Sequence, residues 1–416
     1  MTWTRGFDPP GFTTEWADIP ECEDVPVTDP TWLAAQRRAL VTFAAKAADP
    51  AGGFGWLDAS GGRVAEQPVA TWITARMTHV FSLEHGLGDP DAAALADHGI
   101  AALRGRLHDD QHGGWFASVA DTTKAAYEHS FVLLAACSAH AAGRPGAEEL
   151  LTEALEVIGT RFWDVEVGLP FESWDRAWST TEAYRGANST MHFVEAFLAA
   201  GDVTGDKIWH QRALGLAERI VHVTSAAHGW RVPEHFTEDW RPDLDYNSSN
   251  PRHPFRPFGS TIGHWLEWAR LLLHLEATLG EDAPAWLLPD ARALFDSSVR
   301  RGWGVDGYLG FVYTLDWDDL PVVRERMHWV IAEAIMAASA LRARTGEDPY
   351  ADWYVTFWEY ARKHHIDPVG GWRHELSPDG SPSAGVWAGK PDTYHAYQAT
   401  LFPTLPLSPA AALAVR

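Results

Sequence analysis

Several histidines, arginines and carboxylates occur at helical spacing in apolar segments of this 416-residue chain. His264 and Glu267 are three residues apart, and Asn188 and His192 are four apart, so each pair shares one face of a helix. Histidine changes its charge near neutral pH, which suits it to accept a proton and return it during a reaction. The spacing therefore predicts an acid–base site built on helices, although such pairs are also compatible with simple helix-surface contacts.

Six predicted helices carry polar side chains of this kind in or near their first turns. These helices begin near Trp72, Lys124, Ala187, Thr261, Arg326 and Asp392. Along the chain the side chains are Arg76; Tyr127 and His129; Asn188 and His192; His264 and Glu267; Arg326, His328 and Glu333; and His395. If the six helix N-termini open on one side, these groups converge, and unpaired N–H groups there suit the oxygen atoms of a polar ligand.

Some of these residues have an equally simple structural interpretation. Arg76 is as well suited to a buried ion pair as to ligand binding, and His129 and His328 are suited to capping or packing a helix. His364 and His365 fall at the end of a predicted helix, where cations interact favourably with the helix dipole, so we interpret them as structural.

The elements that must position these side chains form a sixfold repeat. A Gly-rich aromatic loop recurs at Gly52, Gly113, Gly168, His228, Gly307 and Gly370. One helical segment precedes each loop, starting near Thr31, Asp91, Pro145, Lys207, Ala285 and Tyr350, and a second follows it. Hairpins that cannot bury their apolar faces alone stack on their neighbours. We therefore expect an all-α fold, an (α/α)6 barrel with the second helices inside and short Gly and aromatic loops or β-hairpins at one end; an open solenoid is the alternative.

Composition restricts both the domain organisation and the partners. No linker of disordered composition divides the chain, so we expect one domain over 1–416, with an N-terminal arm at 1–30 and a C-terminal arm at 403–416. A formal charge of -23 argues against nucleic acid, and no apolar run resembles a signal peptide or a membrane helix. With only Cys22 and Cys137, a reducing cytoplasm fits. The 22 tryptophans favour a carbohydrate cleft, although many must be core residues.

Other chemistries leave weaker traces in the sequence. Patterns such as HExxH, CxxC, GxGxxG and the P-loop do not occur, so we expect no metal and no cofactor. A glycoside hydrolase is the main enzymatic alternative, because such barrels can place two carboxylates across a sugar. Only Glu267 and Glu333 form an obvious carboxylate pair, however, and histidines suit a proton shuttle better.

Five longer strings resemble the N-acylglucosamine 2-epimerase superfamily, and within it the branch of mannose and sulfoquinovose isomerases. They are WITARM (72–77), YRGANSTMHFVEAFL (184–198), FRPFGSTIGHWLEWARLLLH (255–274), PVVRERMHW (321–329) and WAGKPDTYHAYQATL (387–401). The resemblance extends from about Trp32 to Pro406 and implies an (α/α)6 barrel that interconverts an aldose and its ketose through an enediol without metal.

The resemblance also implies roles for individual residues. His264 and His395 match the acid and base, and we expect Glu267 to support His264 and His192 to stabilise charge on the sugar oxygens. Residues implied to line the sugar pocket or to support it are Arg76, Tyr127, Asn188, Arg256, Trp329, Glu333 and Asp392.

The expected substrate is a monosaccharide. Sulfoquinovose isomerases have an amide before the Asp of the last motif, whereas this chain has Pro391, which favours D-mannose and D-fructose. Sulfoquinovose isomerisation, 2-epimerisation and a non-catalytic sugar-binding barrel are the alternatives, and an oligomer is compatible with the sequence.

Overall fold

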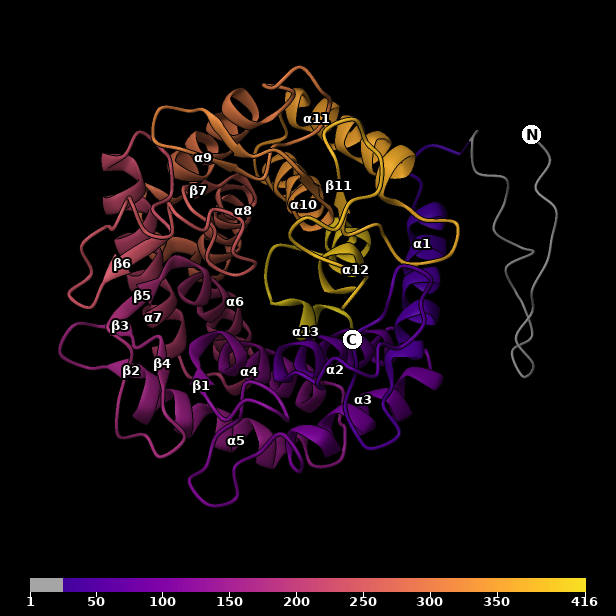
Figure 1. Ribbon diagram of the computed structural model, residues 1–416, viewed down its shortest axis with the longest axis vertical. Coiled ribbons are helices and arrows are strands. Elements are labelled where there is room, and N and C mark those ends of the chain that lie inside the picture. The colour runs from indigo at the N-terminus through magenta and orange to yellow at the C-terminus, as the bar shows by residue number, and fades with distance from the viewer. Residues whose placement is uncertain (1–24) are drawn as a thin grey trace.

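The structure is a computed structural model that describes residues 25–416, and its described part is mostly helical. Six α-helices, each at the start of one hairpin, lie on the outside of the ring seen in Figure 1: α1 (Pro30–Ala44), α3 (Asp91–Leu103), α5 (Ala147–Val157), α7 (Ile208–Ala217), α9 (Leu287–Gly302) and α11 (Asp348–Tyr360). Six inner helices alternate with them: α2 (Thr71–Gly86), α4 (Ala126–Ala141), α6 (Ala187–Thr204), α8 (Ile262–Leu279), α10 (His328–Thr345) and α12 (Tyr394–Leu401). The expectation of a mostly helical fold is confirmed.

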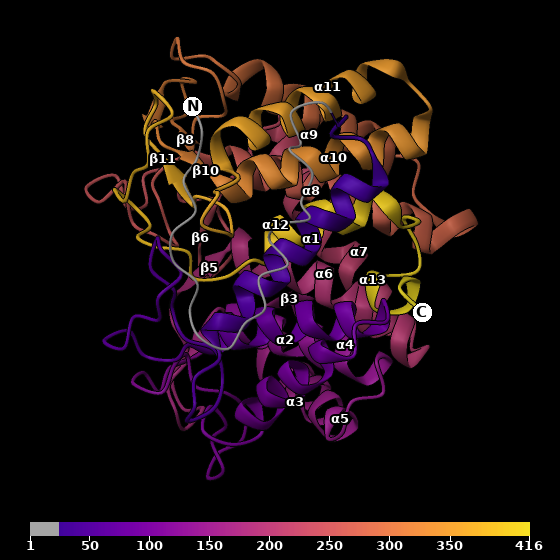
Figure 2. The ribbon, with the colours of Figure 1, turned by 90° about the vertical axis from the view of Figure 1, so that its right-hand side faces the viewer.

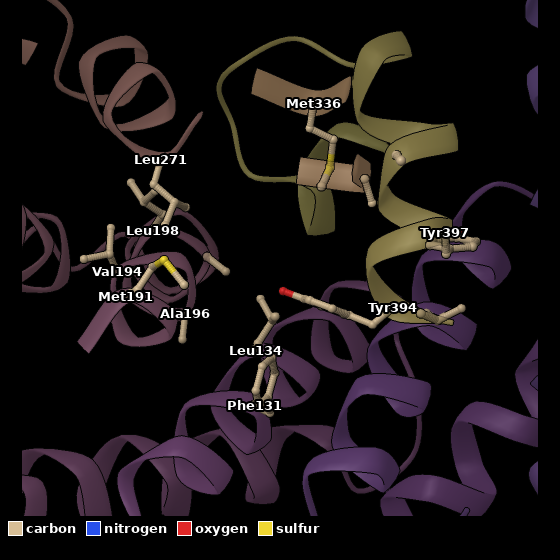
Figure 3. Packing of buried hydrophobic residues seen from close by; sticks show 14 of the residues in the cluster. Phe131, Leu134, Met191, Val194, Ala196, Leu198, Leu271, Met336, Tyr394 and Tyr397 are labelled. Carbon is tan, nitrogen blue, oxygen red and sulfur yellow. The ribbon is translucent and has the colours of Figure 1, made fainter. Parts of the chain in front are cut away.

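Burial distinguishes the two sets of helices. In α5 the buried positions Leu150, Leu151, Ala154 and Val157 recur at helical spacing, which is typical of a helix with one face on a core. The inner helix α4 is buried over nearly its whole length and is rich in alanine, which allows close helix packing. Figure 3 shows buried side chains of the inner helices, such as Phe131, Leu134, Leu198 and Leu271, around the space into which Tyr394 projects.

Helices far apart in sequence are brought together by this packing. Each inner helix contacts the next one along the chain, from α2 through α4, α6, α8 and α10 to α12. The last of them, α12, also contacts α1 and α2, so the two ends of the helical array lie side by side.

Short antiparallel ladders precede four of the inner helices. The strands are β1 (Lys124–Ala125), β2 (Trp163–Asp164), β3 (Leu169–Pro170), β4 (Ser173–Trp174), β5 (Tyr184–Gly186), β6 (His235–Thr237), β7 (Ser260–Thr261), β8 (Thr314–Leu315), β9 (Pro321–Val323), β10 (Arg326–Met327) and β11 (Glu375–Leu376). They pair as β1–β4, β2–β3, β5–β6, β7–β8–β9 and β10–β11. Because each of β1, β5, β7 and β10 ends where an inner helix starts, pairing with the next loop fixes the first turn of that helix.

Gly259 shows why one of these loops needs glycine. Its φ is +91°, and a Cβ there would lie 2.2 Å from the carbonyl oxygen of Leu315 on β8. Only glycine avoids both the strain of this positive φ and the clash of a Cβ with the Leu315 carbonyl oxygen. The chain therefore enters β7 and α8 in close contact with β8.

Short segments of other helix types extend several elements. The 3-10 turns are η2 (Ala45–Ala47), η5 (Gly280–Asp282) and η7 (Phe402–Thr404), and the π-helical turns are η3 (Ile158–Phe162), η4 (Glu218–Ser225) and η6 (Ala361–His365). The three π turns each end an outer helix. Wider turns there lead the chain into the loops between outer and inner helices.

The C-terminal residues pack against the inner helices. Helix α13 (Ala411–Ala414) contacts α2, α4 and α6, and the His274 ring bonds the carbonyl oxygen of Leu407 at 2.7 Å. In Figure 2, α13 lies on the right, whereas β5, β6, β8, β10 and β11 gather on the left. The segment expected as an arm at 403–416 thus covers the end of the molecule opposite to the ladders.

Three further expectations concern the N-terminal arm, the cysteines and membrane helices. Most of the expected arm at 1–30, including Cys22, lies outside the described residues, and Cys137 is a buried free thiol in α4. Within 25–416, no helix is long and apolar enough to cross a membrane.

Candidate active site

A cavity of about 660 Å³ opens at the N-terminal ends of the inner helices, and we call it the histidine cavity. All six inner helices contribute to its wall. Its lining residues are Trp72, Arg76, Tyr127, Asn188, His192, Pro254, Phe255, Pro257, His264, Glu267, Tyr313, His328, Trp329, His374, Trp387, Pro391, Asp392 and His395. The structure therefore places in one cavity all the expected site residues except Arg256 and Glu333.

His264 is held by a carboxylate from a different part of the chain. Its Nδ1 lies 2.7 Å from Oε2 of Glu234, and Oε1 of Glu234 accepts the backbone N–H of Thr261 at 3.0 Å. The expectation that Glu267 supports His264 is wrong. The two residues do share a helix face, but the Glu267 carboxyl group lies deeper, next to His192 and Arg270.

His395 has the same kind of support. Its Nδ1 lies 3.0 Å from Oε1 of Glu333, which stands behind the cavity wall rather than in it. Burial lowers the pKa of His395, so its ring is neutral at neutral pH. Burial opposes ionisation of Glu333 as well, but the adjacent Arg270 guanidinium and the hydrogen bond with His395 together outweigh burial and lower the pKa of that carboxyl. A neutral base backed by a carboxylate can accept a proton and stabilise the resulting imidazolium.

Trp329 stands between the two histidines. Its ring centroid is 5.1 Å from that of His264 and 5.7 Å from that of His395. Within the described chain, neither histidine has a hydrogen bond at Nε2, the nitrogen opposite its carboxylate. Each ring is thus held by a carboxylate at Nδ1, and its Nε2 is available to exchange a proton.

His192 and Glu267 form a third, deeper pair. The Nδ1 of His192 lies 3.6 Å from Oε1 of Glu267 and 3.9 Å from Oε2 of Glu195. Burial lowers the pKa of His192 to about 3, so its ring is neutral at neutral pH. A neutral ring can take part in hydrogen bonds but contributes no positive charge. Burial, together with the charge of Glu333, raises the pKa of Glu267 well above its usual range.

Arg76 crosses the cavity wall between several aromatic rings. It donates to Oδ2 of Asp392 at 3.1 Å and to the hydroxyl of Tyr127 at 2.8 Å, and its guanidinium lies 4.2 Å from the Phe131 ring centroid. Burial and ion pairing occur together here, so both sequence interpretations of Arg76 apply: it is paired, and it lines the cavity.

Arg256 does not line the cavity, in contrast to the expectation. It makes a two-pronged ion pair with Glu182 at 2.6 and 3.0 Å and lies 4.0 Å from the Tyr184 ring centroid. Its loop runs past the cavity, and Phe255, the residue before it, occupies the wall instead.

The structure also places four further residues that the sequence analysis discussed. Arg326 is buried against Asp306 and loop carbonyls, and His129 accepts the backbone N–H of Trp115 at 3.2 Å, so both are structural. His328 lines the cavity and stacks on His374 with a centroid distance of 3.6 Å. His365 bonds the carbonyl of Arg373, which agrees with the structural interpretation of this residue.

Sequence reasoning did not identify the aromatic mouth of the cavity. Phe255 contacts Trp72, Tyr127 and Trp387 edge to face, with centroid distances of 5.1 to 6.0 Å. These residues come from different loops and helices, so spacing along the chain does not connect them. Such rings suit the C–H faces of a sugar.

Two groups of buried side chains have ligand atoms close enough for a metal ion. They are His192, Glu195 and Glu267, and Glu267, Glu333 and His395, with the atoms of each group within 4.8 Å of one another. Arg270 lies among the same carboxylates, 2.9 Å from Glu333 and 3.6 Å from Glu267. The Arg270 guanidinium therefore supplies positive charge beside the same carboxylates that could bind a metal ion.

Comparison with known proteins agrees with this geometry. Residues 52–399 match the family N-acylglucosamine 2-epimerase (GlcNAc 2-epimerase). The chain is 58% identical over 389 residues to a D-mannose isomerase of Thermobifida fusca, covering 92% of this chain and 95% of that protein. It is 53% identical over 392 residues to a D-mannose isomerase of Pseudomonas cannabina pv. alisalensis, covering 92% and 94%.

A solved structure agrees as well. The crystal structure of a D-mannose isomerase superimposes with a TM-score of 0.84 at 30% identity, covering 90% of this chain and 98% of the other. The chain belongs to the N-acylglucosamine 2-epimerase family.

Proposed function

We propose that this protein is an aldose–ketose isomerase that interconverts D-mannose and D-fructose. The observation that carries the proposal is the pair His264 and His395, two cavity histidines that each have a carboxylate at Nδ1 and no protein partner at Nε2 among the described residues. The names of the two relatives described above, both D-mannose isomerases, support the substrate. A non-catalytic sugar-binding barrel would not need two rings prepared in this way.

The charges of the histidine cavity support a neutral sugar. Arg76 is the one arginine among its lining residues in the described chain, no lysine is present there, and Asp392 balances the Arg76 charge. A sulfonate requires a free cation or several donors. With Arg256 paired to Glu182 outside the cavity, the site favours mannose over sulfoquinovose.

The first step is opening of the pyranose ring. In our proposal His264 moves a proton between O1 and the ring oxygen O5 of the sugar. Glu234 accepts the hydrogen at Nδ1, which fixes the tautomer and stabilises the ring whenever it becomes charged.

The second step is proton transfer between carbons. His395 takes the C2 proton, and the C–H electron pair forms the C1–C2 double bond while the π electron pair of the C1–O1 carbonyl moves to O1. O1 then gains the proton that O2 gives up. His395 then returns its proton to C1 from the same face, which yields the ketose. Arg76 and the neutral His192 are the groups we assign to the oxygens of the cis-enediol.

We also infer that the inner helices close into an (α/α)6 barrel. The contacts of α12 with both α10 and α2 support closure over an open solenoid. Closure matters for function because it brings His264 and His395, from the fourth and sixth hairpins, to one cavity.

The proposed function is tested by incubating EDTA-treated protein with D-mannose in D2O and following the products by NMR. We expect D-fructose with deuterium at C1 and, on reversal, deuterium at C2 of mannose. Parallel samples contain sulfoquinovose, D-glucose and N-acetylmannosamine. Faster turnover of any of these would contradict the substrate, loss of activity on chelation would contradict a metal-free reaction, and binding without turnover would identify a sugar-binding protein.

A further inference from the structure

Arg270 lies directly beneath the histidine cavity and faces three carboxylates. It is on α8 and fully buried; its Nε donates to Oε2 of Glu333 at 2.9 Å. Its terminal nitrogens lie 3.6 Å from Glu267 and 4.0 Å from Glu195. One cation is therefore shared by three acids from α6, α8 and α10.

Each of these acids stands beside a cavity histidine. Glu333 is 3.0 Å from His395, and Glu267 and Glu195 are 3.6 and 3.9 Å from His192. The proposed function uses both histidines but leaves Arg270 without a role. Three adjacent carboxylates in a buried layer repel one another, so the position of the single positive charge decides which of them ionises.

We propose that Arg270 is a positioning residue that keeps Glu333 ionised and thereby holds His395 ready to accept the proton from the sugar. Geometry favours Glu333 over the other two acids, because only Glu333 receives a direct hydrogen bond from the guanidinium. Glu267 has no hydrogen-bond partner at either oxygen, as expected for the acid that remains protonated. The inference rests on the proposed function, since it assigns His395 the role of base.

Other charged or titratable groups also face this layer. They are His192 on α6, His274 on α8, Tyr394 and His395 on α12, and Arg76 and Tyr127 on the α2 and α4 side. Burial lowers the pKa of His192 to about 3 and that of His274 to about 4, so both are neutral near pH 7. Arg76 is balanced by Asp392. Arg270 thus has no substitute as a counter-ion for Glu333.

A second cavity, of about 570 Å³, lies on the other side of Arg270, and we call it the C-terminal cavity. Leu134, Leu198 and Leu271, labelled in Figure 3, line it together with Phe402, whose ring centroid is 5.5 Å from the Arg270 guanidinium carbon. Removing the Arg270 side chain would join this space to the carboxylates. A small planar cation added to the solution could then occupy the place of the guanidinium.

The test compares Arg270→Ala and Arg270→Gln with the wild-type protein over a range of pH. Without the cation Glu333 gains a proton at neutral pH, so kcat falls, and it recovers as rising pH ionises Glu333 again. We expect the acidic limb of the kcat profile to lie about 1–3 pH units higher. Guanidinium chloride at a concentration too low to unfold the protein should restore kcat at pH 7 in Arg270→Ala, and Arg270→Lys should keep the wild-type profile.

A matched control is Arg144→Ala, which removes an arginine bound by two hydrogen bonds to Asp97, at 2.8 and 2.6 Å, outside both cavities. Its pH profile should equal that of the wild type, and guanidinium should not change its kcat. A folded Arg270→Gln variant whose activity is lowered equally at every pH, or not at all, would overturn the inference. Wild-type protein that fails to convert mannose would instead contradict the proposed function.

Infrared spectroscopy measures the effect of Arg270 on the ionisation of Glu333 without any turnover. It therefore tests the inference whether or not the wild-type protein converts mannose. Arg270→Gln should show an extra protonated-carboxyl band at pH 7, and the double variant with Glu333→Gln should lack it. Absence of the band in Arg270→Gln, or its persistence in the double variant, would mean that Arg270 does not control the ionisation of Glu333.

Discussion

Oε2 of Glu234 lies 2.7 Å from Nδ1 of His264, although the two residues are thirty positions apart in the chain. Glu234 immediately precedes β6, and its other oxygen accepts the N–H of Thr261 at the entry to α8. One carboxylate therefore fixes both the start of the helix and the orientation of the histidine it carries. This pairing supports the acid–base role proposed for His264.

Glu234→Gln should therefore impair catalysis much more than it impairs folding. Glutamine preserves size and can still face the His264 ring, but it cannot stabilise the imidazolium. We expect kcat for mannose to fall by about 10²–10⁴-fold, the range for loss of effective acid–base catalysis. Steady-state kinetics with thermal unfolding as a check on the fold would measure it.

Glu267→Gln is the comparison for that experiment. Because burial beside Glu333 raises the pKa of Glu267 well above its usual range, glutamine resembles the protonated form that this position favours, and the loss in kcat should stay below about tenfold. If Glu267→Gln instead gave the larger loss and Glu234→Gln gave none, the pairing of His264 with its own helix neighbour would be correct after all.

The contrast between Glu234 and Glu267 indicates what the sequence can and cannot predict. Helical periodicity and the six glycine-aromatic loops predicted the hairpins, because each hairpin is a local unit. Periodicity placed some helix starts too early: helices expected from Lys124, Arg326 and Asp392 begin at Ala126, His328 and Tyr394. Lys124 and Arg326 are in strands instead, paired with residues of the following loop.

Residue spacing could not predict side-chain contacts between residues far apart in the sequence. The i, i+3 relation of His264 and Glu267 was real, yet it did not reveal that Glu234 would approach from another loop. The prediction that Arg256 lines the sugar pocket was wrong for a related reason. Arg256 belongs to a motif of the family, but in the fold its side chain pairs with Glu182. Family motifs identify positions in the cavity better than they identify contacts.

His395→Ala should abolish both turnover and exchange of the C2 hydrogen of mannose with solvent deuterium. The reason is that His395 is the proposed base for C2 and has its Nδ1 bonded to Glu333. NMR in D2O measures exchange and isomerisation in one sample. Continued C2 exchange in His395→Ala, with the wild type as control, would assign the proton transfer to another group.

Stability should fall as the pH is lowered from about 7 towards 4, because several buried histidines are neutral in the folded protein. Burial lowers the pKa of His79, His274 and His374 to about 4 and that of His129 and His365 to about 3. The unfolded chain binds protons near pH 6.5 and the folded chain does not, so this stabilisation is complete above pH 6.5 and is lost below it. Urea unfolding at pH 7.5 and 5.5 measures the difference.

His365→Asn isolates one contribution to this pH dependence. Asparagine can still donate to the Arg373 carbonyl, which His365 bonds at 2.9 Å, but it does not titrate. The drop in unfolding free energy between pH 7.5 and 5.5 should become about 1 kcal/mol smaller than in the wild type. An unchanged drop would show that His365 titrates normally in the folded protein.

Gly263→Ala should damage the site through a single methyl group. Gly263 precedes His264 on α8, and a Cβ there would lie 2.2 Å from the ring of Trp329 and 2.8 Å from Val330. The ring of Trp329 separates His264 from His395, so displacing it moves the groups that must hold the sugar. We expect kcat/KM to fall by about 10²-fold and stability by about 1–3 kcal/mol.

Gly215→Ala is the control, since Gly215 lies in α7 and a Cβ there meets nothing within 4 Å. Alanine is the better helix former, so this variant should gain about 0.5–1 kcal/mol of stability and keep the wild-type kcat/KM. Kinetics and thermal unfolding of the two variants separate a general effect of alanine from contact with Trp329. Wild-type kcat/KM in Gly263→Ala would mean that Trp329 can move without disturbing either histidine, and that its place between them has no part in catalysis.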